Sequence, residues 1–367
     1  MNNLVIICAI LLLVLLFLKV PVYIAVLSAS AVYFIGTPGM NLSIFAQKTI
    51  SGAEGLSLLA IPFFVCAGIF MNYTGVTKRI MNCCEVLTAR MPGGLAQVNI
   101  LLSTLMGGLS GSSLADAAMQ CKMLVPTMES KGYSKSFSTV ITAASGMVVP
   151  LIPPGVGLII YGCINNISIG KLFIAGIGPG IVLCVTLMIF THFLSKKRGY
   201  LPSRTTKIPV SEKIAAVKPA FLPLLLPIII IGGVRIGIFT ASEAGTVAIV
   251  YAVLLGLLYK ELTLKNVMQG CKETVTTTAS IMLIVAAATC FSWILTKEQI
   301  PQQFSQWMIS NIHNKYVFLI MVNIFLLIVG MFIEGNASMI VLAPLLHPVA
   351  MAYGIDDIHF AMVYIFN

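Results

Sequence analysis

A run of small and hydroxyl-bearing residues interrupts a long apolar stretch at residues 95–128. The run, GLSGSS at residues 108–113, offers hydroxyl and carbonyl oxygens, and its glycines let a backbone bend around an ion. Irregular backbone at membrane depth persists only where protein, water or a ligand satisfies its polar groups. Hard monovalent cations need only neutral oxygen ligands, so the run predicts a cation site. The site residues predicted in this run are Ser110, Gly111, Ser112 and Ser113.

Two other interruptions offer related chemistry. The motif PLIPPG at residues 150–155 lies inside an apolar segment at 138–166, and each proline there removes a backbone donor and frees a carbonyl. The motif EGNAS at residues 334–338 interrupts the stretch 317–350, and its asparagine supplies an amide oxygen and donors for an anion. The site residues predicted in these motifs are Pro153, Pro154, Gly155, Glu334, Gly335, Asn336 and Ser338.

Two acids lie beside these motifs, Asp116 and Glu334. An acid within a membrane is costly unless it is paired, protonated or functional, so we include both in the candidate site. The alternative is a structural role, in which each acid pairs with Lys122 or with a helix N-terminus. Likewise, glycine and serine can simply permit close helix packing, and proline can simply kink a helix.

The composition places the chain in lipid. Hydrophobic residues make up 58% of the chain and charged residues 9%, and the mean hydropathy is +1.00. We therefore predict an all-α polytopic membrane protein. The formal net charge of +10 comes from Lys and Arg between apolar segments, which is typical of membrane orientation and argues against nucleic-acid binding. The apolar segments are 3–18, 22–36, 56–73, 172–194, 220–239, 241–259 and 278–295.

An internal repeat relates the two halves of the chain. An offset of about 222 residues carries the first three apolar segments onto later ones and superimposes the two long interrupted stretches. We expect those stretches to form two re-entrant helical hairpins, which leaves five crossings in the first half and inverts the second. With a basic linker at 195–218 on the cytoplasmic side, about three times as many Lys and Arg residues lie inside as outside. This predicts an N-terminus on the outer side.

The repeat also predicts a division of the chain. The first inverted repeat covers residues 1–194 and the second covers 219–367, with the linker between them. The broken segment at 138–166 should recur at 360–388, so we expect the second repeat to be incomplete and the sequence to be truncated at its C-terminus.

The motifs together resemble the large membrane (permease) subunit of tripartite ATP-independent periplasmic (TRAP) transporters. The resemblance rests on residues 108–116, 152–155 and 334–338, with IPFF at 61–64 and MPGG at 91–94. It implies a sodium-driven importer in the bacterial inner membrane, and no enzyme. The expected substrate is an organic acid anion, such as a C4-dicarboxylate, a sialic acid or a related sugar acid. The implied partners are a small four-helix membrane subunit and a periplasmic solute-binding protein.

The same resemblance implies an elevator mechanism with Na+ as the coupling ion and no cofactor. Residues 56–166 and 278 onward would form the moving part, while 1–50 and 172–258 form a scaffold. One sodium site would use Ser110, Ser112 and Ser113 with the loop 153–155. The other would use Gly335, Asn336 and Ser338, and the substrate would lie between the two tips. Asp357 departs from the family pattern, which has proline there.

Two other functions remain open on the sequence. Residues 108–111 read G-x-S-G, as in an intramembrane serine protease, in which Ser110 would need His192 as its base. An ion channel is the other alternative, and it would need a continuous polar pore rather than two closed hairpins.

Overall fold

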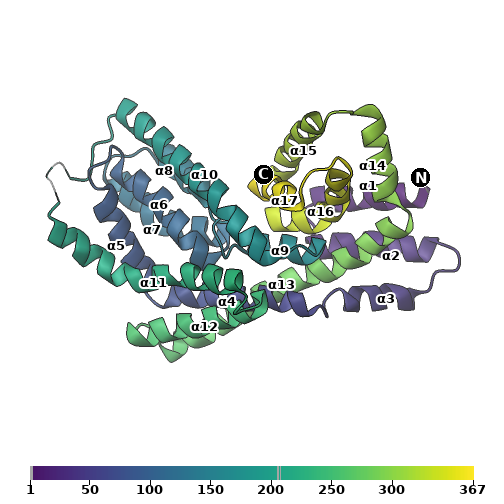
Figure 1. Ribbon diagram of the computed structural model, residues 1–367, viewed down its shortest axis with the longest axis horizontal. Helices are drawn as coiled ribbons and strands as arrows, with labels where there is room; N and C mark the ends of the chain where they lie inside the picture. The colour runs from purple at the N-terminus through teal and green to yellow at the C-terminus, as the bar shows by residue number, and fades with distance from the viewer. Residues whose placement is uncertain (1–2, 205, 207) are drawn as a thin grey trace.

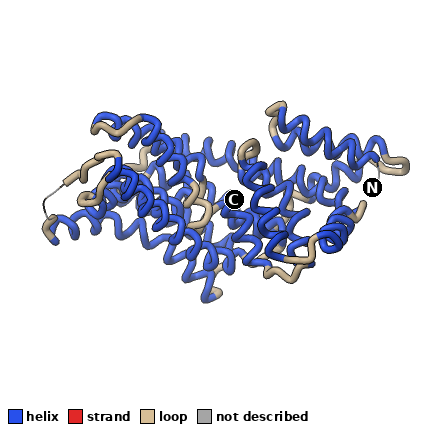
Figure 2. The backbone as a smooth tube through the Cα atoms, turned by 90° about the horizontal axis from the view of Figure 1, so that it is seen from above, coloured by secondary structure: helices blue, strands red, loops and turns tan. Residues whose placement is uncertain are grey.

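The computed structural model describes residues 3–204, 206 and 208–367. In this part of the chain every regular element is helical, which confirms the all-α prediction (Figure 2). The elements are α1 (Asn3–Phe17), α2 (Val22–Gly36), α3 (Leu42–Ser51), the 3₁₀ helix η1 (Leu56–Leu59), α4 (Ala60–Tyr73), α5 (Val76–Thr88), α6 (Gly94–Ser110), α7 (Ser113–Ser130), α8 (Lys135–Gly146), α9 (Val156–Asn165), α10 (Ile169–Lys197), α11 (Val210–Ile236), α12 (Ala241–Leu258), α13 (Leu264–Lys297), α14 (Ile300–Asn311), α15 (Lys315–Gly330), α16 (Gly335–Ala352) and α17 (Asp357–Phe366).

Long apolar helices dominate the described chain. Six of them are long and apolar enough to cross a membrane, and they include α10, α11, α12 and α13. Large apolar side chains face outward along these helices, among them Phe190 and Phe193 on α10. Such a surface is stable only against lipid or another apolar partner, so the chain is a multi-pass membrane protein.

Both long interrupted stretches form helix–loop–helix pairs, as predicted. Helices α6 and α7 are joined at Gly111–Ser112, and α15 and α16 are joined by residues 331–334. The unwound parts are shorter than expected or displaced: α6 continues through Ser110, and α16 begins at Gly335, so most of EGNAS is helical. The helix forms there because the Glu334 side chain caps it, accepting a hydrogen bond from the Ala337 N–H at 3.0 Å.

The offset of 222 residues recurs in the helix boundaries. The N-caps of α7 and α16 are Ser112 and Glu334, and the N-caps of α8 and α17 are Ser134 and Asp356. One difference separates the halves: α3 and α4 are separate helices, whereas the corresponding second-half segment is the single helix α13, which is 34 residues long. The inverted orientation and the division at 194 and 219 remain predictions.

Helices extend into both ends of the predicted linker. Helix α10 continues to Lys197 and α11 begins at Val210, so the non-helical connection is shorter than 195–218. Pro209 is the N-cap of α11, a position where its missing N–H removes no helical hydrogen bond.

Tyr200 fastens the connection to the base of the first hairpin. Its ring centroid lies 4.4 Å from that of Tyr133 and 5.1 Å from that of Phe137. The Ser134 N–H donates to the Tyr200 hydroxyl at 3.1 Å, and the Gly93 N–H donates to the Tyr200 carbonyl at 3.2 Å. Hydrogen bonding with Ser134 lowers the pKa of Tyr200, while burial raises the pKa of Tyr133. The turn between α7 and α8 is thus held to the end of α10.

Replacing Tyr200 with alanine should loosen this contact. Each aromatic pair contributes about 0.5–1.5 kcal/mol beyond its buried area, so hydrogen exchange at the Ser134 and Gly93 amides should accelerate about tenfold or more. Tyr200→Phe keeps the stacking and the backbone carbonyl but loses the hydroxyl, so it should retain protection at the Gly93 amide while the Ser134 amide loses its acceptor. Equal acceleration of the Gly93 amide in both variants would show that stacking is not what holds the connection.

The helices fall into two groups that meet near α9 (Figure 1). One group contains α5–α8, α10 and α11, and the other contains α1–α3 and α14–α17. Helix α16 packs against α9, and α17 packs against α16 and α10. This arrangement brings the N-terminus of α16 close to the tip between α6 and α7, although the two tips are far apart in sequence.

Candidate functional site

A cavity of about 450 Å³ lies between the two hairpin tips. Seven of the predicted site residues line it, and they come from both halves of the chain: Gly111, Ser112, Ser113, Glu334, Gly335, Asn336 and Ser338. Other lining residues come from the turn before α9, from α9, α15 and α16, and from the end of α17, among them Pro150, Gly157, Leu326, Met339, Tyr364 and Asn367. Both predicted tips therefore border one cavity, and the position of a substrate between them stays a prediction.

The first tip is a sharp turn at Gly111. This residue has φ +62° and its N–H donates to the Gly107 carbonyl, which ends α6. The Ser112 Oγ then caps α7 by accepting a hydrogen bond from the Ala115 N–H at 3.4 Å. Ser113 is half-buried in the cavity wall. The Ser110 side chain lies outside the described part of the chain.

The proline-rich segment lies directly against this tip. The Val156 N–H donates to the Gly111 carbonyl at 3.3 Å, and a Cβ built on Gly111 would lie 3.2 Å from the Pro154 carbonyl oxygen. Pro153, Pro154 and Gly155 are buried, and none of them is among the cavity-lining residues. Their carbonyls and the Ser112 hydroxyl therefore form an oxygen-rich region next to the cavity, which fits a sodium ion chemically.

Gly108 allows this close approach. A Cβ at Gly108 would lie 2.8 Å from the Pro153 carbonyl oxygen and 3.0 Å from Pro227 Cγ. Gly108→Ala should therefore force α6 away from the proline-rich segment and destabilise the fold by about 1–3 kcal/mol, measured as a lower melting temperature in detergent. Gly178→Ala is the matched control, because no atom lies within 4 Å of its added methyl. An equal loss in both variants would contradict the packing argument.

The second tip is ordered by Glu334. Besides capping α16, its Oε1 accepts a hydrogen bond from the Asn336 Nδ2 at 2.8 Å. The amide oxygen of Asn336 then faces α9, 3.8 Å from a Cβ built on Gly157. Ser338 is buried, and its carbonyl accepts a hydrogen bond from the Tyr364 hydroxyl at 3.1 Å.

Asp116 lies outside the cavity wall. Its side chain is 1% exposed, and its Oδ2 accepts hydrogen bonds at 2.7 Å from Ser103 Oγ and from Gln120 Nε2. It thereby ties α7 to α6 within the first hairpin. The sequence alternative that pairs Asp116 with Lys122 is wrong, because the partners are these neutral side chains. The other alternative, pairing with a helix N-terminus, describes Glu334, which caps α16. Glu334 also lines the cavity.

Three helix N-termini converge on the cavity. Helix α7 begins at Ser113, α9 begins at Val156, and α16 begins at Gly335. The helix dipole and the N–H groups left unpaired in the first turn give each such end a partial positive charge of about half a unit. One N–H group in each first turn is already bonded: that of Ala115 to Ser112 Oγ, that of Val156 to the Gly111 carbonyl, and that of Ala337 to the Glu334 carboxylate. No Lys, Arg or His is found among the described lining residues. An anion in the cavity would therefore be held by backbone N–H groups, as anions commonly are at helix N-termini.

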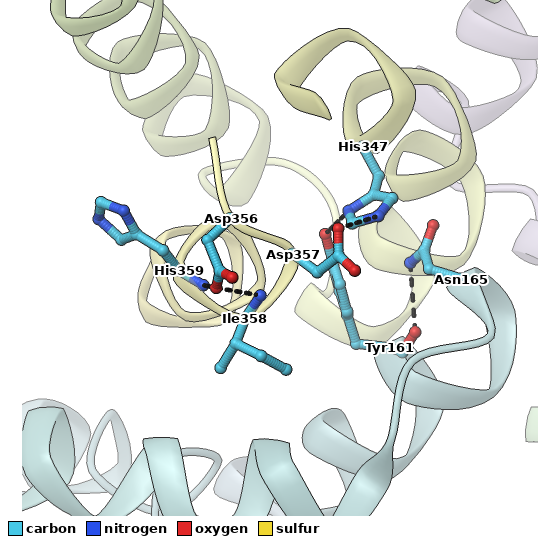
Figure 3. Close-up of polar contacts among 7 residues, drawn as sticks. All are labelled: Tyr161, Asn165, His347, Asp356, Asp357, Ile358 and His359. Carbon is cyan, nitrogen blue, oxygen red and sulfur yellow. Dashed lines mark hydrogen bonds and ion pairs between the residues drawn. The ribbon is translucent and has the colours of Figure 1, made fainter. Parts of the chain in front are cut away.

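A polar chain fixes α16 relative to α9 and α17 (Figure 3). The Tyr161 hydroxyl lies 3.1 Å from His347 Nδ1, and His347 Nε2 lies 3.9 Å from Asp357 Oδ1. Asn165 Nδ2 donates to the Tyr161 carbonyl at 3.2 Å. Tyr161 and His347 were not predicted from the sequence, because neither belongs to an interrupted motif; the one signal was the unusual acid at Asp357.

The fold and the cavity define a helical membrane protein whose two hairpin tips enclose a polar site, an arrangement suited to carrying a solute. The chain belongs to the family described as the DctM component of the tripartite ATP-independent periplasmic transporter, whose model matches residues 9–367. This confirms the resemblance stated from the motifs.

Comparisons with individual proteins agree with this assignment. The chain is 41% identical over 354 residues to the sialic acid TRAP transporter large permease protein SiaM of Vibrio cholerae, covering 96% of this chain and 82% of that protein. It is 36% identical over 348 residues to the 2,3-diketo-L-gulonate TRAP transporter large permease protein YiaN of Escherichia coli, covering 95% and 81%. The crystal structure of the Alcanivorax borkumensis YdaH transporter shares the fold, with a TM-score of 0.60 at 12% identity, covering 89% of this chain and 76% of that one.

Proposed function

We propose that this chain carries an organic acid anion across the bacterial inner membrane, driven by sodium. The observation that supports this most strongly is the cavity between the tips, where three helix N-termini meet and basic side chains are absent from the described wall. Backbone N–H groups suit a carboxylate, and the hydroxyl and carbonyl oxygens beside the first tip suit Na+. The sugar-acid substrates named for two relatives favour the same class of solute.

The remaining parts of the proposal follow from the family. The chain acts with a small membrane subunit of four helices and with a periplasmic binding protein that delivers the anion. The part bearing both hairpins moves against the scaffold as an elevator, and the N-terminus lies on the periplasmic side. Each sodium ion that enters down the membrane potential contributes about 2.3 kcal/mol per 100 mV.

Uptake into proteoliposomes tests the proposal. The chain is reconstituted with its small subunit and binding protein, and N-acetylneuraminate, 2,3-diketo-L-gulonate and succinate are offered as labelled probes. We expect uptake of at least one probe, and a drop of at least tenfold when external sodium is replaced by potassium. Uptake that is indifferent to this replacement would refute sodium coupling. Failure to accumulate any organic acid would refute the transport function.

The protease alternative is not favoured by the packing. Gly180 on α10 packs against Ile152, which in turn lies beside Gly107 and Gly108 near the first tip. His192 is twelve residues further along the same helix, which places it about 18 Å from Gly180. The proposed base therefore lies far from the serine it would activate, and a proton transfer needs contact within hydrogen-bond distance.

A further inference from the structure

A second cavity of about 460 Å³ lies at the other end of α9. Gly157, at the N-terminal end of α9, borders the first cavity, whereas Cys163 and Ile164, at its C-terminal end, border the second. Gly157 and Cys163 are six residues apart on α9, so the two spaces are about 9 Å apart along the helix. Helix α16 borders both, because its first turn lines the first cavity, and Ile340 and Pro344 line the second.

The wall of the second cavity is rich in uncharged polar groups. One face of α13 supplies Thr289, Ser292, Trp293 and Thr296, whose spacing of three or four residues places them side by side. Ser51, Ser57, Cys163 and Asn166 add further polar groups from the opposite side. Gly52 lets α3 approach α13 closely here, because a Cβ on Gly52 would lie 2.6 Å from Thr289 Cβ.

Two ammonium groups lie over the ring of Trp293. Lys48 Nζ is 5.6 Å and Lys297 Nζ is 5.5 Å from the ring centroid. Among the described side chains, neither ammonium forms an ion pair. Two acids are close in sequence: Glu298 accepts a hydrogen bond from the Tyr33 hydroxyl, and Glu54 is exposed and is not a lining residue. Neither lysine is itself a lining residue, so the positive charge lies beside Trp293 at the margin of the cavity, without a matched carboxylate.

We propose that the second cavity is an entry site that binds a polyhydroxylated organic acid before it reaches the cavity between the tips. The carboxylate is held by Lys48 and Lys297, the hydroxyl groups bond to the serine, threonine and asparagine side chains, and the apolar face of the solute packs on Trp293. This inference rests on the proposed function for its substrate class. It assigns the binding to residues outside both hairpin tips.

Trp293 provides a direct reporter for this site. The chain has two tryptophans, and Trp307 is an exposed residue on α14, so Trp307→Phe leaves Trp293 as the one indole. We titrate this full-length variant in detergent with N-acetylneuraminate, 2,3-diketo-L-gulonate and succinate, and record its fluorescence. We expect a saturable change with one of the two sugar acids, and a weaker response to succinate, which has no hydroxyl groups.

Matched variants show whether the change in Trp293 fluorescence depends on the two lysines. Lys48→Gln with Lys297→Gln should raise the ligand concentration needed for half the change at least tenfold, whereas Lys48→Arg with Lys297→Arg should retain it. Lys315→Gln is the control for charge, because Lys315 also lies over an aromatic ring, but that ring belongs to Tyr316, which does not line the second cavity. Asn336→Ala, in the first cavity, should leave the fluorescence response unchanged.

The outcomes separate this inference from the transport function. No saturable response to any probe, or a response lost in Asn336→Ala and kept in the double glutamine variant, would overturn the entry site even if uptake is normal. Should the double glutamine variant fail to fold, Lys297→Gln alone, at an exposed side chain, must still weaken binding several-fold. A retained response in a preparation without sodium-dependent uptake would support the site while refuting the proposed transport.

Discussion

Asn336→Ala should reduce sodium-dependent uptake by about ten- to a hundredfold. A hydrogen bond to a charged group contributes about 1.5–3 kcal/mol, and Asn336 is the amide that both lines the cavity between the tips and is oriented there by Glu334. Its loss should raise the concentration of solute needed for half-maximal uptake, because we propose that the side chain contacts the anion or its sodium ion. Initial rates over a range of solute concentrations measure this effect.

Asn311→Ala serves as the control for this change. Asn311 is exposed at the end of α14, and its side chain bonds only to local groups, the Trp307 carbonyl and the Ser310 hydroxyl. We expect its uptake to match that of the unaltered chain. Normal uptake in Asn336→Ala would show that the Asn336 side chain of the second tip is not part of the binding site.

Asp116→Ala should destabilise the protein by about 1–3 kcal/mol. Removing the carboxylate leaves the buried Ser103 hydroxyl without its acceptor, while Gln120 Nε2 keeps Ser103 Oγ as an acceptor at 2.6 Å; an unsatisfied buried group costs about 1–3 kcal/mol. A lower melting temperature in detergent, with faster hydrogen exchange across α6 and α7, should report this loss.

Asp116→Asn separates this structural role from a role in ion binding. The amide keeps an oxygen that can accept both hydrogen bonds, so the variant should recover most of the stability. If stability is normal in Asp116→Ala but uptake is lost, the carboxylate acts in transport, and its placement here as a link between α6 and α7 is wrong.

Much of the fold could be read from the sequence because the membrane leaves few choices. The segment 22–36 and the helix α2 coincide, and the predicted breaks at residues 150–155 and beside Gly111 are present. Apolar length predicts helices in lipid, and glycine and proline mark where they end. Seven of the residues predicted from these interruptions line one cavity.

The remaining features depend on contacts that no local pattern encodes. Glu334 was expected in an unwound tip, yet it is the N-cap of α16, because its carboxylate accepts a hydrogen bond from the Ala337 N–H in the first turn. Asp116 was included in the candidate site for its charge. Its carboxylate instead accepts hydrogen bonds from Ser103 and Gln120 within the first hairpin, away from the cavity. Tyr161 and His347 are 186 residues apart in sequence and meet only because α9 packs on α16.

The difference between α13 and its first-half counterpart has a mechanical consequence. At 34 residues, α13 is about 51 Å long, well beyond a hydrocarbon core of about 30 Å, so its polar first turns lie outside the core or the helix is steeply inclined. The matching first-half segment is jointed at residues 52–55, between α3 and η1. A displacement of one end of α13 therefore moves the other end with it, because the helix is continuous. In the first-half counterpart the break between α3 and η1 allows the two parts to move separately.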